Sequence, residues 1–153
     1  MSKKEKQKVK VKMFNNKKWM YITGGLLVVL IIFTLFISTN YPELPEGYNE
    51  EQVIEESKRA IEFFNERDYQ SIVDMGGGKL VVTAEQFAEQ CDGPLDACGE
   101  FIGYKDIQTM GAKDNKSGNE YGGAVIKAEY ENYDVKFIIA FDLDMNLVEF
   151  LPQ

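Results

Sequence analysis

Histidine is absent from this sequence of 153 residues, and only two cysteines occur in it. Histidine is the side chain whose pKa best suits proton transfer near neutral pH, and it is the commonest protein ligand of metals. Without it, acid–base chemistry would fall to carboxylates and tyrosines, and two thiols alone cannot complete a zinc site. The sequence therefore predicts no catalytic residue, no metal site and no cofactor.

Two short motifs also lack residues that a ligand site requires. The run Gly76–Lys79 resembles a phosphate-binding loop, but Leu80 stands where a serine or threonine would bind magnesium. The Asp-x-Asp-x-Asn motif that starts at Asp142 resembles the beginning of a calcium loop, but Leu147 occupies the glycine position. We interpret the first motif as a plain loop and the second as a hairpin turn.

Charge is missing from a stretch of twenty residues, Trp19 to Ser38. A helix of that length is about 30 Å long, which matches the hydrocarbon core of a bilayer. The preceding residues 1–18 carry eight lysines and one acid, and lysine-rich flanks of this kind stay on the cytoplasmic side. We predict a basic cytoplasmic tail over 1–18, a transmembrane helix over 19–38 and an extracytoplasmic location for all later residues.

A cleaved signal peptide is the alternative interpretation of this N-terminal segment. Its apolar run is longer than the about 7–15 residues of a signal peptide, and no A-x-A-like cleavage site follows it. We therefore favour a signal-anchor and a single-pass protein of the cell membrane, which contacts the bilayer through Trp19 to Ser38. Residues 39–48, which include Pro42, Pro45 and Gly47, form a short linker to one domain over 49–153.

The part of the chain after the basic tail is strongly acidic. The tail contributes +7 to the net charge of −8, so residues 19–153 carry nine Lys and Arg against 24 Asp and Glu, a net charge of −15. Such a surface repels nucleic acid and favours basic partners. Solubility alone is the simpler explanation of the same charge.

Helical spacing dominates the first half of the predicted domain. Asn49 is a candidate N-cap, and the apolar residues after it recur every three or four positions as far as about Arg67. Asp68 can cap a second, short helix, which the glycines at 76–78 end. Thr83 and Gln86 have the spacing of a capping box at the start of a third helix.

Alternation with a period of two dominates the second half, from Tyr104 onward. Residues 124–130 and 135–141 read as two strands, with a tight connection at Glu131 and Asn132. A turn over 143–146 leads into a last strand that ends near Leu151. We predict an α+β fold in which three helices precede an antiparallel meander of about four strands and cover one face of the sheet.

Several short runs resemble a known superfamily. They are ERDYQSIVDM after the first helix, TAEQFAEQ, GEF at 99–101 and the terminal FIIAFDLDMNLVEF. Residues 50–153 are thereby similar to small extracytoplasmic domains of unknown function in the nuclear transport factor 2-like, cystatin-related superfamily. The resemblance implies a curved sheet wrapped around helices to form a cone with an apolar interior. Enzymes, binding modules and oligomerisation domains all use this scaffold, so the fold does not choose among them.

The two cysteines, Cys91 and Cys98, are separated by the turn-prone residues Asp92–Ala97. In an oxidising exterior this spacing favours a disulfide between them. Two buried free thiols are the first alternative. Metal binding or redox activity is the second, although C-x6-C is not the usual redox spacing.

The resemblance also nominates candidate ligand contacts, since cones of this kind are often hollow. Tyr69, Tyr104, Asp106 and Tyr130 are the polar side chains that we nominate as pocket residues by this analogy. Several phenylalanines could line the same cavity, and their spacing is equally typical of a filled core.

These observations favour a membrane-anchored extracytoplasmic module that binds a surface protein or a small apolar ligand. A structural or oligomerising domain without ligand is the alternative from a second class. An isomerase- or dehydratase-type enzyme acting on a small apolar substrate is the third. A cavity in which a carboxylate contacts a tyrosine would favour the enzyme, whereas a filled interior would favour a partner protein.

Overall fold

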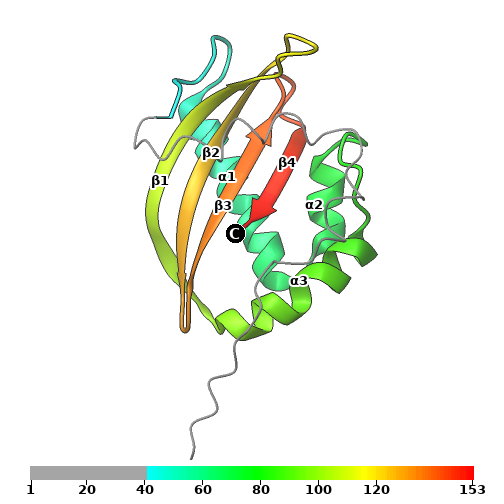
Figure 1. Ribbon diagram of the computed structural model, residues 1–153, viewed down its shortest axis with the longest axis vertical. Coiled ribbons are helices and arrows are strands. Elements are labelled where there is room, and N and C mark those ends of the chain that lie inside the picture. Colours follow the sequence, from blue (N-terminus) through cyan, green and yellow to red (C-terminus); the bar gives the residue numbers. More distant parts are fainter. Residues whose placement is uncertain (1–40) are drawn as a thin grey trace, which may run out of the picture.

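The computed structural model describes residues 41–153, in which a layer of helices packs against one antiparallel sheet (Figure 1). The predicted tail 1–18 and transmembrane helix 19–38 lie outside the described residues. Among residues 41–153, none of the helices is long and apolar enough to cross a membrane. The elements, in chain order, are α1 (Glu50–Glu66), α2 (Tyr69–Met75), α3 (Ala84–Cys98), β1 (Phe101–Lys113), β2 (Glu120–Tyr130), β3 (Asp134–Phe141) and β4 (Leu147–Pro152).

Side-chain caps begin the three helices where the sequence predicts them. Asn49 accepts the backbone N–H three residues on at 2.9 Å at the start of α1, and Asp68 caps α2 in the same way. Thr83 and Gln86 form the complete capping box of α3. Each cap satisfies a backbone N–H that the first turn of a helix leaves without a partner.

The third helix is longer than the sequence predicts. We expected a turn over Asp92–Ala97, but α3 continues through Pro94 to Cys98. The side chains of Cys91, Leu95 and Cys98 lie on one face of this helix and are buried in the core. Burial of this apolar face outweighs the local preference of glycine and proline for a turn.

The sheet is a meander with the strand order β1-β2-β3-β4, and all neighbours are antiparallel. The predicted α+β class and the order of helices before strands are therefore confirmed. The first strand begins at Phe101, earlier than the alternation that starts at Tyr104. Register shifts interrupt its pairing with β2 between Phe101 and Gly103 and between Tyr104 and Asp106. These bulges hide the period of two at the start of β1.

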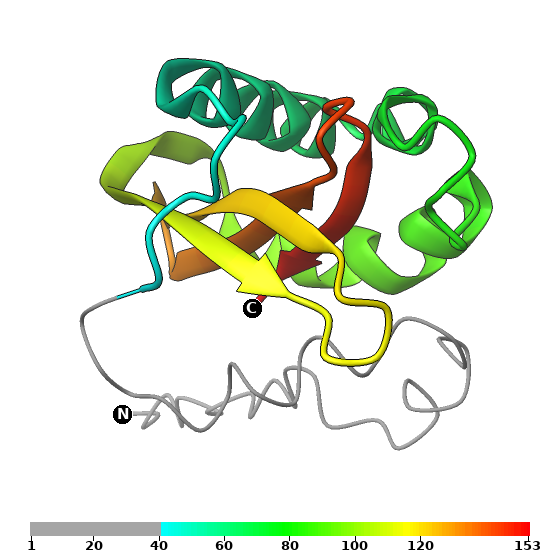
Figure 2. The same cartoon turned by 90° about the horizontal axis from the view of Figure 1, so that it is seen from above.

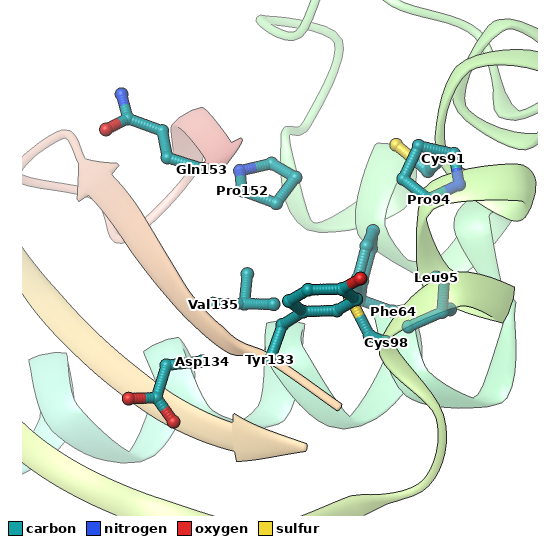
Figure 3. Close-up of a pocket in the computed structure, with 10 residues that line it drawn as sticks. All are labelled: Phe64, Cys91, Pro94, Leu95, Cys98, Tyr133, Asp134, Val135, Pro152 and Gln153. Carbon is teal, nitrogen blue, oxygen red and sulfur yellow. The ribbon is translucent and has the colours of Figure 1, made fainter. Parts of the chain in front are cut away.

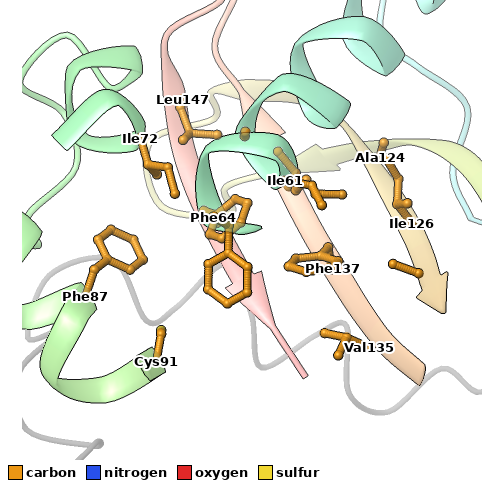
Figure 4. Packing of buried hydrophobic residues seen from close by; sticks show 14 of the residues in the cluster. Ile61, Phe64, Ile72, Phe87, Cys91, Ala124, Ile126, Val135, Phe137 and Leu147 are labelled. Carbon is orange, nitrogen blue, oxygen red and sulfur yellow. The ribbon is translucent and has the colours of Figure 1, made fainter. Parts of the chain in front are cut away.

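The helices cover one face of the sheet, with α1 lying along it (Figure 2). Apolar side chains from α1, α2, α3 and the sheet meet in one core between the two layers (Figure 4). We call the opposite side of the sheet the outer face. Its own small apolar cluster consists of Met110, Val125 and Ile138.

Candidate functional site

Aromatic side chains fill the space between the helices and the sheet. The ring of Phe64, on α1, lies 5.5 Å from the ring of Phe137 and 5.6 Å from that of Phe150. Phe87 of α3 reaches the same group, with its ring centroid 6.2 Å from that of Phe150 (Figure 4). Edge-to-face and tilted packing of this kind is typical of a core rather than of a ligand cavity.

A small pocket of about 40 Å³ opens beside α3, at the turn between β2 and β3 (Figure 3). Sites for separate small molecules usually enclose roughly 300–1,000 Å³, so this space suits a single small side chain. The residues that line it are Phe64, Cys91, Pro94, Leu95, Cys98, Tyr133, Asp134, Val135, Pro152 and Gln153.

Three rigid elements hold the walls of this pocket. One wall is a face of α3, and another is the start of β3 at Val135. The end of β4 forms a third, because Gln153 exchanges two backbone hydrogen bonds with Lys136, at 2.8 and 2.9 Å. Tyr133 stands at the mouth with 41% of its surface exposed. The result is an apolar recess with a large aromatic side chain at its rim.

The prediction of a disulfide between Cys91 and Cys98 is wrong, because both cysteines are free thiols. They lie seven residues apart in the same helix, so their Cα atoms are separated by about 10.5 Å along its axis. A disulfide requires Cα atoms less than about 7 Å apart. The predicted turn would have brought them together, and the continuous helix keeps them apart.

Both thiols stay protonated at neutral pH. Burial raises the pKa of Cys91 to about 11, with a smaller contribution from the nearby Asp92, and burial also raises the pKa of Cys98. A thiolate, not a thiol, is the nucleophile and the metal ligand. The two cysteines therefore serve as small apolar wall residues of the pocket.

Two of the nominated pocket residues, Tyr104 and Tyr130, lie close together. Both rings pack edge-on against Phe101, at centroid distances of 5.1 and 5.6 Å. The Tyr130 hydroxyl donates to Oδ1 of Asn65 at 2.5 Å, and the Tyr104 hydroxyl is buried without a protein hydrogen-bond partner. Burial raises the pKa of Tyr104 to about 12 and that of Tyr130 further. Both phenols are neutral at physiological pH.

The other two nominated residues lie elsewhere. Tyr69 packs in the core against Phe87 and donates to Oδ1 of Asp92 at 2.7 Å, and its burial raises its pKa. Asp106 is exposed on the outer face, where its carboxylate accepts from the Gln108 amide at 2.9 Å. The structure thus brings together one pair of the four, and none of them lines the pocket beside α3.

The outer face carries features that the sequence analysis missed. Tyr41 and Leu151 pack against its cluster of Met110, Val125 and Ile138. Glu149 lies on the same face opposite Ala140, and burial raises its pKa to about 7. The sequence does indicate an apolar outer face, because the middle parts of β2 and β3 carry apolar residues on both faces of the sheet. A strand with one solvated face usually alternates more strictly.

Among the described residues, no three His, Cys, Asp or Glu side chains are grouped so as to hold a metal ion. Asp142 instead caps the turn between β3 and β4. Its Oδ1 accepts from the backbone N–H groups of Asp144 and Asn146, at 3.0 and 2.9 Å. Lys79 donates to the other oxygen of the carboxylate. This agrees with the interpretation of the motif as a hairpin turn.

Comparison with known proteins gives one family and one solved structure. A family model described as "Protein of unknown function (DUF3887)" matches residues 57–150. The chain is also similar to the NMR structure of a protein from Ruminococcus gnavus, with 31% sequence identity and a TM-score of 0.63. That match covers 72% of this chain and 96% of the other. The comparison with curated proteins found no match.

Proposed function

Because the chain belongs to the family described as "Protein of unknown function (DUF3887)", which names no activity, we propose a function from its own structure. We propose that it is a membrane-anchored extracytoplasmic interaction module. In this proposal, the recess beside α3 binds an apolar side chain of a partner protein. The anchor is the predicted span over 19–38, and the superfamily is the nuclear transport factor 2-like one that the sequence resembles.

The observation that carries this proposal is the pocket itself. Its lining is largely apolar, it is open at the surface, and its volume of about 40 Å³ is too small for a typical separate ligand. An exposed aromatic such as Tyr133 at the rim is typical of interface residues that anchor a protein partner. The filled interior supports a partner protein in preference to an internal ligand.

Charge indicates the chemistry of the partner segment. All four charged side chains of α3 are acidic: Glu85, Glu89, Asp92 and Asp96. Arg67 pairs with the last two, which leaves the N-terminal half of the helix negative. A partner segment with basic residues beside its apolar anchor would be attracted to this helix.

The enzyme alternative has less support. A tyrosine and a carboxylate do meet at Tyr69 and Asp92, but neither of them lines the pocket. Asp92 also accepts a hydrogen bond from Arg67 at 2.8 Å. This arrangement joins the end of α1 and the start of α2 to α3.

Site-specific photocrosslinking in living cells tests the proposal. A photoreactive amino acid replaces Tyr133 in the full-length chain, and a matched variant carries it at Glu55, which is exposed on α1. We expect a discrete protein adduct from position 133 and none from 55. The substitution Val135→Leu, which adds one methylene group to the pocket wall, should weaken this adduct while the protein stays folded.

Three outcomes would count against the proposal. The same adducts from both positions would show that contact is unspecific. An unchanged adduct in folded Val135→Leu protein would show that the pocket is not the contact. An adduct containing two copies of this chain would instead favour the oligomerising alternative.

A further inference from the structure

The last strand, β4, forms an edge of the sheet, and no described strand pairs with its other side (Figure 1). Its end shows which backbone groups face that open side. Gln153 and Lys136 exchange two hydrogen bonds, and in an antiparallel ladder such pairs alternate with pairs that exchange none. Leu151 therefore bonds to β3, whereas Phe150 and Pro152 direct their backbone groups to the open side. Proline suits this position because it has no N–H to leave unpaired.

The backbone of Phe150 is left without a partner at this edge. The residue is only 7% exposed. Among residues 41–153, no loop or turn backbone bonds to its N–H or C=O. A buried backbone group without a hydrogen bond costs free energy. An extended segment that pairs with this edge would supply the missing bonds.

The recess of the proposed function lies beside the same open edge. Pro152 and Gln153 of β4 form one of its walls, and α3 forms another (Figure 3). The side chain of Phe150 lies in the core on the helix-covered face of the sheet, and Pro152 is opposite the core residue Phe137. Directly opposed residues of neighbouring strands point to the same face. A residue paired with Pro152 would therefore direct its side chain toward the recess.

The other edge of the sheet is less suited to an added strand. Two register shifts interrupt the first half of β1. Near its end, the N–H of Gly111 is already bound to the carbonyl of Pro42, at 2.8 Å. The pairing of β4 has one irregularity, beside Phe141, and is regular from Glu149 to Pro152. Bulges protect sheet edges against further pairing, so β4 is the better site.

Charge favours a different protein over a second copy of this chain as the added strand. Residues 49–153 carry 22 Asp and Glu against nine Lys and Arg, a net charge of −13. Two such domains repel each other. The charged side chains of α3 are all acidic, so this wall of the recess attracts a basic segment.

We propose that an extended segment of a partner protein adds to the open edge of β4 as a further strand. It pairs with the backbone of Phe150 and places a small apolar side chain, flanked by basic residues, in the recess beside Pro152. This inference rests on the proposed function and specifies the conformation and chemistry of the partner segment.

Peptide selection on the full-length protein in phosphatidylcholine nanodiscs tests this binding mode. A phage library of random linear peptides supplies the probe, and we expect it to yield a basic peptide with a small apolar residue. N-methyl groups placed on successive residues of that peptide should abolish binding at every second position only, because alternate N–H groups face β4. When the peptide is bound, the amide of Phe150 should exchange with deuterium at least about tenfold more slowly.

Two variants control for the recess. Val135→Leu, which fills part of it, should weaken binding of the selected peptide, whereas Glu55→Gln on the exposed side of α1 should not. Equal binding by wild type and folded Val135→Leu protein would overturn the placement of the side chain in the recess.

Three further outcomes would overturn the added strand. They are N-methyl effects without a period of two, unchanged exchange at Phe150, and failure to select any peptide. In each case a specific crosslink from position 133 in living cells would still support the proposed function, so the two failures are distinguishable. A dimer in which the Phe150 amide is protected without peptide would show that a second copy occupies the edge, which would also overturn the proposal.

Discussion

At the scale of single residues, Arg67 joins the end of α1 to α3. It caps α1 in the left-handed region, with φ at 60°, and its guanidinium donates to Asp92 at 2.8 Å and also to Asp96. The hydrogen bond from Tyr69 and the charge of Arg67 lower the pKa of Asp92. Arginine pays a steric cost in this backbone conformation that glycine would avoid.

The side chain of Arg67 stabilises the fold while its backbone conformation is strained. Two variants of this residue should therefore differ in their free energy of unfolding. Arg67→Ala loses the ion pairs and keeps the backbone strain, so it should lower the free energy of unfolding by up to about 1 kcal/mol. Arg67→Gly loses the same pairs but relieves the strain, so it should be more stable than Arg67→Ala by about 1 kcal/mol. Urea denaturation of residues 41–153 measures both. Equal stabilities would show that the strain is not present.

Asp142 predicts a dependence of stability on pH. Burial alone would raise its pKa, but hydrogen bonds from Lys79 and Asn146 outweigh burial and hold the pKa below its usual 3.8. The stabilisation is therefore fully present above pH 3.8 and is lost as the pH falls through the lower pKa of the folded state. Asp142→Asn should lower the melting temperature at pH 7, and the difference from the natural protein should shrink in this acidic range. A difference that stays constant with pH would contradict this account.

At the scale of elements, α3 shows why the disulfide prediction was wrong. Gly93 and Pro94 indicate a turn when they are read locally, and a turn would have brought the cysteines together. The helical face made by Cys91, Leu95 and Cys98 is buried, with exposures of 3%, 7% and 5%. Packing of this face against distant parts of the chain determines the conformation of the segment. A local motif such as Gly93-Pro94 carries no information about that packing.

The continuous helix predicts a thiol result. Both cysteines should react with a thiol reagent when the unreduced protein is unfolded in its presence, because no bond joins them. Reduction should leave the melting temperature of the folded domain unchanged. The variant Cys98→Ser, labelled once per chain, calibrates the assay. Protection of both thiols in the unfolded, unreduced protein would mean that a bridge does form.

At the scale of the whole molecule, the two layers could be predicted because their signals are local. The caps at Asn49, Asp68 and Thr83 and the alternation of β2 and β3 predict the helices, the strands and their order. The pocket beside α3 could not be predicted, since its walls come from segments far apart in the sequence. For the same reason, the sequence could not show that Tyr104 lies beside Tyr130. Nor could it show that Tyr69 and Asp106 lie elsewhere.

The linker contacts predict that the independently folding unit begins before Asn49. The Tyr48 hydroxyl donates to the carbonyl of Phe141 at 3.0 Å, and the missing side chain of Gly122 makes room for the Tyr48 ring. A domain that starts at Tyr41 should therefore fold without the predicted span and melt several degrees above one that starts at Asn49. Differential scanning calorimetry compares the two. Equal melting temperatures would show that residues 41–48 add no stability.

The central claim, an interaction module held outside the membrane by its N-terminal segment, is tested most directly by protease accessibility. Right-side-out membrane vesicles contain the full-length chain with one tag at each end. Added protease should remove the C-terminal tag and leave the N-terminal tag intact until detergent is added, because the lysine-rich tail is predicted to stay in the cytoplasm. A protected C-terminal tag together with a cleaved N-terminal tag would contradict the account.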